Sequence, residues 1–210
     1  KIRADYEEGF VKEDKDSSDP WNRYFVNARG NRQELEKFRQ MTEFTDEDKR
    51  LMLDTLRDKD FLDTTAEVLA SYLRAALPYK NNFCTELYQK YLLAPRAGHE
   101  KLMGSRSRIV SLLSEKNVFP QDGTVTAKMV WEYVNPVPDY GTGNWPAEAD
   151  GCIKCEIITE VSKRVVFVEI CRAIGILARL NPVTGKAESV CEKNGEICFE
   201  SMEKEVQKID

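Results

Sequence analysis

Apolar residues recur every three to four positions through the first half of this 210-residue chain, which is the spacing of amphipathic helices. Thr45 is placed to cap one such helix, and another must end before Pro78. The period is carried by Leu35, Phe38, Leu53, Leu56, Leu69, Leu73, Leu87, Leu92, Ile109, Leu113, Val130 and Val134. We therefore predict a helical half over residues 31–134.

Residues 1–30 lack this period. They are acidic and include the stretch Ser17-Ser18-Asp19-Pro20, which is typical of a connecting segment. We predict that they form a linker or a trailing segment of an earlier domain. Because the chain starts without a Met or a signal-like apolar run, we expect it to be a processed or trimmed piece of a longer protein.

A run of residues that is apolar on almost every helical face marks residues 160–174 as a buried core helix. Thr159 is a candidate N-cap for this helix, and Gly175 is the residue type favoured just past a helix end. Strand-like segments follow at residues 176–180, 187–192 and 196–202. Helices that come first and antiparallel strands that come last indicate the α+β class, with the core helix and the sheet in residues 135–210.

The dipeptide Asn194-Gly195 between the last two strands is a strong signal for a two-residue hairpin turn. Counting outward from this turn pairs Cys191 with Cys198, so the two thiols face each other. A disulfide is geometrically possible there, although Cβ atoms are farther apart at a hydrogen-bonded pair than at the alternate kind. The sequence leaves the bridge open, and a bridged pair would favour an oxidising compartment.

A second cysteine pair, Cys152 and Cys155, forms a C-x-x-C motif. A tetrahedral zinc site needs two more ligands, and the sequence offers no matching C-x-x-C or paired histidines. We predict no metal site and no cofactor.

Charge and hydropathy argue against two classes of partner. The formal net charge is −5, and Lys and Arg alternate with Asp and Glu, so we predict no nucleic-acid partner. The most apolar window, residues 165–180, is interrupted by Glu169, Arg172 and Arg179, so we predict no membrane span. The hydrophobic fraction of 41% is that of a folded globular chain with a real core.

The stretch from residue 135 to residue 158 is irregular, with three prolines and three glycines. Irregular stretches of this length inside compact domains are usually functional or disordered. Tyr140 and Trp145 lie in it, and aromatic side chains give contact area at little entropic cost. We predict these two as ligand-binding residues, whereas the apolar helical pattern around Trp131 favours a position in the core.

Several motifs resemble transglutaminase-like domains, which belong to the papain-type thiol enzyme superfamily. The segments SKRVVFV (residues 162–168) and CRAIGILARL (residues 171–180) look like the core helix and first strand of that family. NPVTGK (181–186), DFLDTTAEVL (60–69) and YLLAPR (91–96) are similar to a large bacterial subgroup, often found in gut-associated species as parts of multidomain proteins. The resemblance covers most of the chain from Trp21 onward and implies the same α+β fold.

The resemblance also implies that catalysis has been lost. In active members the nucleophilic Cys starts the core helix, and a His and then an Asp or Asn follow on the next strands. The corresponding positions here are Glu160, Ala187 and Glu200, so the catalytic set is absent. The family's cleft, with Ser162 and Arg164 at the helix start, is then expected to bind a peptide, protein or glycan-linked ligand. The same resemblance favours an extracytoplasmic or cell-surface location in a larger bacterial protein with other domains.

Two alternatives remain open. Cys155 lies five residues before the expected nucleophile position, and His99 is the single histidine of the chain. A site rearranged around Cys155 would make the chain a thiol hydrolase or an amide-transfer enzyme. The other alternative is a purely structural spacer within a longer secreted protein. A thiol-reactive probe distinguishes a reactive Cys155 from an inert one.

Overall fold

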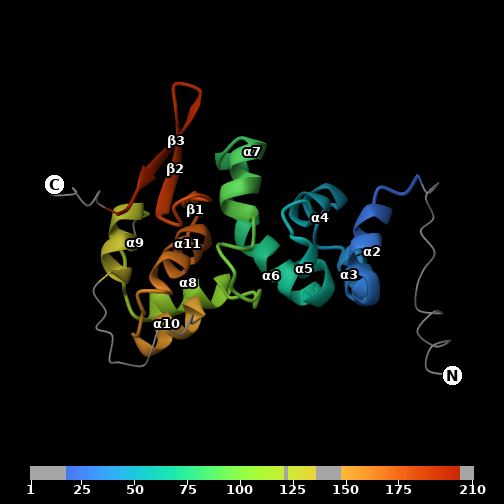
Figure 1. The fold of residues 1–210 in the computed structure, drawn as a ribbon, viewed down its shortest axis with the longest axis horizontal. Helices are drawn as coiled ribbons and strands as arrows, with labels where there is room; N and C mark the ends of the chain where they lie inside the picture. Colours follow the sequence, from blue (N-terminus) through green and yellow to red (C-terminus); the bar gives the residue numbers. More distant parts are fainter. Residues whose placement is uncertain (1–17, 121–122, 136–147, 204–210) are drawn as a thin grey trace.

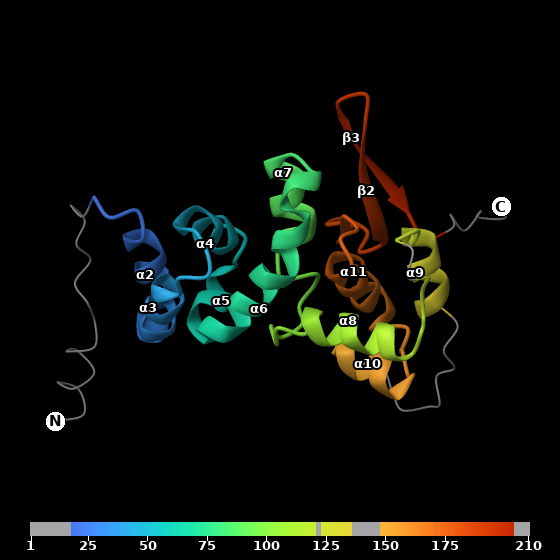
Figure 2. The same cartoon turned by 180° about the vertical axis from the view of Figure 1, so that it is seen from behind.

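The computed structural model describes residues 18–120, 123–135 and 148–203. Helices come first and a small antiparallel sheet comes last, which confirms the α+β class predicted from the sequence. The body is elongated, with the first helices at one end and the sheet with the last helices at the other (Figures 1 and 2).

The first part of the chain is a helical bundle. Its helices are α2 (Asn22–Ala28), α3 (Arg32–Gln40), α4 (Asp46–Leu53), α5 (Asp58–Asp63) and α6 (Ala66–Ala76). A 3₁₀ turn (Leu77–Asn82), α7 (Thr85–Tyr88) and a π-helical turn (Gln89–Leu93) follow it. Thr45 caps α4 as predicted, because its hydroxyl accepts a hydrogen bond from the Asp48 N–H at 3.1 Å.

Residues 18–30 belong to this bundle. Four apolar side chains at the i, i+3, i+4 and i+7 spacing of one helix face are buried in its core: Trp21, Tyr24, Phe25 and Ala28. The linker predicted for residues 1–30 is therefore wrong from residue 18 onward. A helix this short gives too little periodicity to be recognised, and α3 and α5, which pack against it, supply the burial. Residues 1–17 lie outside the described residues.

The second part of the chain is built around α11. It contains α8 (Arg106–Glu115), α9 (Ala127–Val134), α10 (Ala149–Cys155) and α11 (Lys163–Ala173), whose apolar side chains form a second core. The first core draws on residues 21–102 together with Leu177 and Val190. The predicted division between residues 134 and 135 does not match this packing, since α8 and α9 lie against α11. Helical periodicity shows which side chains are buried but not against which partner.

α11 is the buried core helix that the sequence predicts. It begins at Lys163 and not at residue 160, because a turn intervenes in which the Ser162 N–H donates to the Thr159 hydroxyl at 3.2 Å. At the other end Gly175 has a φ of 84°, and the Ile176 N–H donates to the Cys171 carbonyl at 2.8 Å. This is the helix-end geometry for which glycine is favoured. All residues from 166 to 173 are buried.

The sheet consists of β1 (Ala178–Leu180), β2 (Ala187–Lys193) and β3 (Glu196–Ser201), in the order β1-β2-β3. Asn194 and Gly195 have φ values of 54° and 80°, as a two-residue type I′ turn requires. The predicted register is confirmed, with Cys191 opposite Cys198. Both thiols are free.

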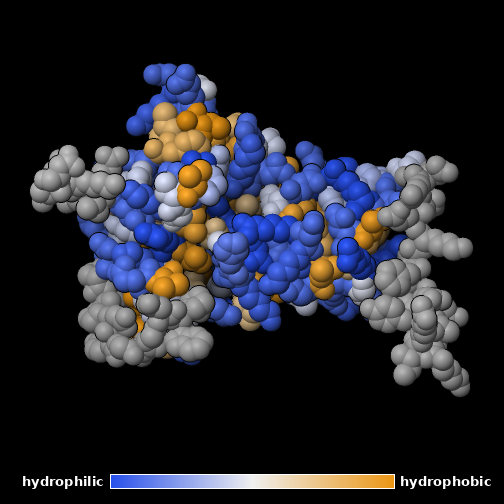
Figure 3. Space-filling model, in the orientation of Figure 1, coloured by the Kyte–Doolittle hydropathy of each residue, from blue (hydrophilic) through white to orange (hydrophobic). Residues whose placement is uncertain are grey.

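Side chains alternate between the two faces of the sheet. Ala178 and Ala187 face the second core, whereas Val190 and Ile197 pack on the first core. The hairpin of β2 and β3 projects from the body of the molecule (Figure 1), and hydrophobic side chains gather below its tip (Figure 3). Phe199, opposite Val190 in the hairpin, is 40% exposed. The sheet therefore lies between the two cores.

Two buried arginines also join the two parts of the molecule. Arg106 of α8 donates to the carbonyl oxygens of Leu92 and Ala94 at 2.7 and 2.6 Å. Arg172 of α11 donates to four carbonyl oxygens, those of Tyr91, Ala94, Arg96 and Ala178. Burial lowers the pKa of Arg172 to about 10, and the four acceptors satisfy its charge. The segment after the π-helical turn is thereby fixed against α11.

Candidate functional site

The positions that the family resemblance assigns to catalysis are divided between the turn before α11 and the sheet. Glu160 lies in the turn before α11 and pairs with Lys163 at 2.6 Å. Ala187 is fully buried at the start of β2. Glu200 lies on β3 and pairs with Lys128 of α9 at 3.2 Å. Both carboxylates are thus held by lysines and are not brought together as partners in a catalytic set.

Glu203, just past β3, is the carboxylate that reaches the start of α11. The Arg164 Nε and Nη2 donate to its two oxygens at 2.7 and 2.8 Å, and the Ala187 N–H donates to Oε1 at 3.3 Å. The bonds from Arg164 are the largest cause of a lowered pKa for Glu203. Sequence reasoning missed Glu203, because an acidic residue after the last strand carries no signal until β2 and β3 pair. Arg164, predicted to bind a ligand, is occupied by this ion pair.

Ser162, also predicted to bind a ligand, belongs to the turn before α11. It is 2% exposed, and its hydroxyl accepts a hydrogen bond from the Thr159 hydroxyl at 3.0 Å. This polar pair stabilises the turn and lies out of contact with solvent.

Cys155 and His99, the residues of the enzymatic alternative, lie in different parts of the molecule. Cys155 is exposed at the end of α10, with Lys116, just past α8, among its charged neighbours. His99 is exposed in the loop after the π-helical turn, next to Gly98, whose carbonyl accepts from Arg57 at 3.1 Å. No contact joins the two in the part of the chain that the structure describes.

The aromatic residues of the predicted binding loop, Tyr140 and Trp145, lie outside the described residues. Trp131, for which a core position was predicted, packs edge-on against Phe167 with ring centroids 5.5 Å apart. The Lys163 Nζ lies 5.6 Å from the centre of the Trp131 ring. Trp131 therefore contributes to the second core, as predicted.

The Cys152 thiol of the C-x-x-C motif is buried, and burial raises its pKa to about 11. Over residues 18–120, 123–135 and 148–203, no three His, Cys, Asp or Glu side chains gather in a metal-binding cluster. None of the described helices combines the length and the apolar character needed to cross a bilayer.

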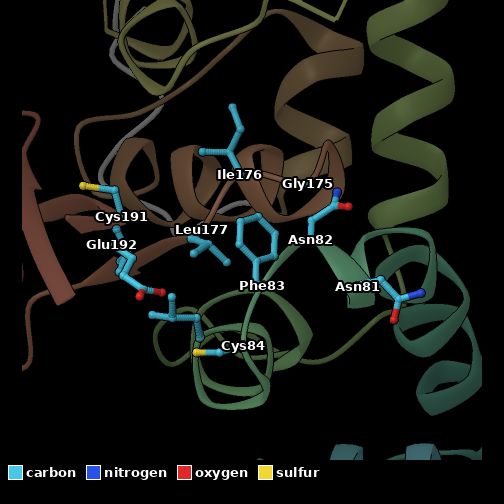
Figure 4. Close-up of a pocket in the computed structure, with 11 residues that line it drawn as sticks. Asn81, Asn82, Phe83, Cys84, Gly175, Ile176, Leu177, Cys191 and Glu192 are labelled. Atoms are coloured by element: carbon cyan, nitrogen blue, oxygen red, sulfur yellow. The ribbon is translucent and has the colours of Figure 1, made fainter. Parts of the chain in front are cut away.

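A groove lies beyond the opposite, C-terminal end of α11 (Figure 4). Its volume is about 510 Å³, within the range of small-ligand sites. Three segments far apart in the sequence line it: residues 81–84 with Leu87, residues 175–177, and residues 190–192. The first comes from the helical bundle and the others from the α11–β1 turn and β2. The groove therefore lies where the two parts of the molecule meet.

Gly175 holds the two sides of the groove together. A Cβ atom at this position would lie 2.4 Å from a ring carbon of Tyr79, so the ring of Tyr79 packs directly on the glycine backbone. The Val190 N–H donates to the Leu177 carbonyl at 2.9 Å, which joins the α11–β1 turn to β2. The contact with Tyr79 depends on a residue without a side chain at the end of α11.

The floor of the groove is apolar and its rim is polar. Leu87, Leu177 and Val190 are buried beneath it, and Phe83 is half-buried. Asn81, Asn82 and Glu192 are exposed at the rim. Figure 4 shows Cys84 on the bundle side and Cys191 with Glu192 on the sheet side.

The amides of the rim offer both donors and acceptors, and Glu192 offers a negative charge. The described lining residues include two thiols but neither a His nor a Lys that could act as a base. Glu192 is thus the one carboxylate among the described lining residues. Sequence reasoning missed the groove, because residues 175–177 and 190–192 were recognised only as a helix end and a strand, and residues 81–84 were assigned no element.

No protein-family model matches the chain, and no significant match is found among curated proteins or among solved structures. The fold and the groove are therefore what describe the protein: an α+β chain with a groove lined by segments from both of its parts.

Proposed function

We propose that this chain is a non-catalytic binding module whose groove takes an extended peptide with an apolar side chain next to a basic one. The observation that carries this proposal is the combination, in one groove, of an apolar floor with a rim of amides and a carboxylate.

Each part of the groove suits one part of such a peptide. The buried floor accepts an apolar side chain and removes it from water. The amides of Asn81 and Asn82 are suited to hydrogen bonds with main-chain N–H and C=O groups, and Glu192 is suited to a Lys or Arg side chain. A neutral glycan leaves Glu192 without a partner, so the groove favours a peptide over a glycan-linked ligand.

The proposal extends to the family. We take the chain to be a transglutaminase-like domain with a degenerate active site, in a larger extracytoplasmic bacterial protein. The support is the packing of α11 against β1 and β2, and the order of one core helix followed by three antiparallel strands, which the resemblance implies. The ion pair of Arg164 with Glu203 occupies the start of α11, where the resemblance would require a thiolate and its base.

Binding is tested on the full chain by fluorescence anisotropy with a peptide library that varies two adjacent positions. Peptides with an apolar–basic pair should bind, and replacing the basic residue by Glu should weaken binding. Glu192→Lys should weaken binding by about tenfold, because it replaces a charge-assisted pair by repulsion. Glu196→Lys is the matched control, since it makes the same charge change on the same hairpin outside the groove.

Equal effects of Glu192→Lys and Glu196→Lys would place binding elsewhere than in the groove. Binding of glycans but not of peptides would replace the peptide by a glycan-linked ligand. A chain that binds neither class would be a structural spacer.

The non-catalytic part of the proposal is tested separately, with generic peptide and glutamine-amide substrates and with iodoacetamide at neutral pH. We expect no turnover, and Cys155 should be alkylated no faster than an ordinary exposed thiol. Turnover that disappears in Cys155→Ala, together with fast alkylation there, would establish the thiol enzyme instead.

A further inference from the structure

All six cysteines of the chain lie in its described part, and all carry free thiols. Among them, Cys191 and Cys198 face each other across paired strands. From this pairing we infer that Cys191 and Cys198 form a reversible dithiol–disulfide site that closes the hairpin beside the groove.

The strand register places the two cysteines directly opposite each other. Lys193 and Glu196 flank the two-residue turn and form the hydrogen-bonded pair next to it, so the pair two positions farther, Cys191 and Cys198, is of the same kind. Cα atoms at such pairs lie roughly 5.5 Å apart, and disulfides most often join Cα atoms separated by roughly 5.5–6 Å. Both side chains leave the same face of the sheet. Cβ atoms at such pairs lie roughly 5.5 Å apart, whereas a disulfide joins Cβ atoms roughly 3.5–4.5 Å apart. A bridge therefore requires rotation of both side chains and a local approach of the two strands.

Accessibility separates this pair from the other cysteines. Cys191 and Cys198 are both half-exposed, so a small disulfide reaches them from solvent. Cys152 lies one helical turn from Cys155 but is 2% exposed and covered by the second core. Cys84 lines the groove on the bundle side and has no cysteine opposite it in a strand register.

The chemistry is thiol–disulfide exchange with a low-molecular-weight disulfide such as glutathione disulfide. One thiolate of the pair attacks this disulfide and forms a mixed disulfide, releasing one glutathione thiolate that takes up a proton. The second thiolate of the pair then attacks the mixed disulfide, forms the bridge between Cys191 and Cys198, and releases the second glutathione. The chain loses two hydrogens, and glutathione disulfide is reduced to two glutathione molecules. An excess of reduced glutathione reverses both steps.

Closing the bridge affects the groove, because Cys191 and its neighbours in β2 form one of its walls. The bridge joins β2 to β3 and restricts the hairpin, which projects from the body of the molecule (Figure 1). We expect the oxidised and reduced chains to bind the peptide with different affinities. This coupling rests on the proposed function, whereas formation of the bridge does not.

Formation of the bridge is tested on the full chain in buffers of defined glutathione to glutathione-disulfide ratio. After an acid quench and alkylation, trypsin cleaves at Lys186, Lys193 and Lys204, so residues 187–193 and 194–204 separate unless a disulfide joins them. The expected product is this linked pair of peptides, lighter by two hydrogens than the sum of the free peptides. It should disappear and return as the ratio is changed in both directions.

Two variants sharpen the result. Cys84→Ser should leave the linked pair unchanged, and Cys198→Ser should leave Cys191 as a lasting adduct with glutathione. Glutathione adducts on both cysteines without a linked pair would overturn the inference, as would a link from Cys191 to Cys84.

The coupling is measured by peptide affinity and by hydrogen exchange of the hairpin amides in the oxidised and reduced chains. Slower exchange at residues 191–198 and an affinity change of about threefold or more support it. Equal affinities in the two states overturn the coupling. If no peptide binds in either state, the proposed function fails, while the linked peptides still decide whether the bridge forms.

Discussion

The two ends of α11 differ in how the chain around them satisfies its polar groups. At the first end, Arg164 is bound by Glu203, and Lys163 by Glu160. At the second end, Gly175 has no side chain, and the amides of Asn81 and Asn82 are exposed beside an apolar floor. One end is thus closed by its own ion pairs, and the other leaves polar groups exposed to solvent.

This difference teaches that the two ends of α11 oppose an incoming ligand to different degrees. The sequence resemblance directs attention to the first end of α11, where the described side chains already pair with one another. An ion pair that must be broken opposes ligand binding, whereas exposed amides above buried apolar side chains lose little on binding. We therefore expect changes at the second end to affect ligand binding and changes at the first end to affect stability alone.

The largest expected effect comes from Phe167→Ala, which removes the packing that supports both ends of α11. Phe167 is fully buried and contacts Trp131 edge-on. The loss of unfolding free energy should be about 3–5 kcal/mol, measured by urea denaturation. Val183→Ala is the control, since Val183 is 91% exposed and should change stability by less than about 0.5 kcal/mol. A loss below about 1 kcal/mol for Phe167→Ala would show that the core face is misplaced.

Gly175→Ala tests the second end of α11 directly. The new Cβ meets the ring of Tyr79 at 2.4 Å, and the φ of 84° is unfavourable for alanine. The two costs together should reduce the unfolding free energy by about 2–4 kcal/mol. Gly195→Ala is the matched control, because Gly195 has a φ of 80° and no atom within 4 Å of a new Cβ. It should lose only about 1–2 kcal/mol. Equal losses in chemical denaturation would mean that Tyr79 moves aside without cost.

The middle of α11 contains a buried acid, Glu169, that makes stability depend on pH. Glu169 is 3% exposed, and neither carboxylate oxygen has a hydrogen-bond partner among the described residues. The nearest cation is Arg106, whose Nε lies 3.8 Å away, and Arg172, Glu100 and Tyr72 are its other charged or titratable neighbours. Burial raises the pKa of Glu169 from its ordinary 4.5 to about 7.

The direction of the pH effect follows from this raised pKa. Between pH 4.5 and 7 the folded chain binds the proton more tightly than the unfolded chain, so stability should rise as the pH falls through this window. The gain contributed by Glu169 should approach about 3 kcal/mol. Glu169→Gln should remove most of this dependence, measured as the difference in unfolding free energy between about pH 5 and about pH 8. Parallel profiles of the two proteins would show that Glu169 is ionised and satisfied in the fold.

The smallest expected effect is that of Glu203→Gln at the first end of α11. The Arg164 side chain is 40% exposed, so breaking its ion pair should cost no more than about 1 kcal/mol. Because Arg164 lowers the pKa of Glu203, this contribution is present at neutral pH and is lost as the pH falls below the ordinary range of a glutamate. Peptide affinity should not change. A loss of binding comparable with that of Glu192→Lys would make the first end of α11 the binding site.

Local patterns in the sequence were sufficient to predict the structure of segments whose conformation depends mainly on their own residues. The turn at Asn194-Gly195 sets the register of β2 and β3, so the pairing of Cys191 with Cys198 was predictable by counting. Gly175 was recognisable as a helix end, because the required positive φ is a property of a single residue. The order of helices and strands likewise determined the α+β class.

Tertiary structure alone decided the features that depend on which segments meet. Three features are of this kind: the burial of α2, the division of the apolar side chains between two cores, and the ion pair of Arg164 with Glu203. Each depends on contacts between segments that are distant in sequence or that lack a recognisable pattern. The groove is the clearest case, because residues near positions 82, 176 and 191 acquire a shared floor and rim only when the two cores pack together. Periodicity records whether a side chain is buried, but the identity of its neighbours is set by long-range packing, which no single stretch of sequence contains.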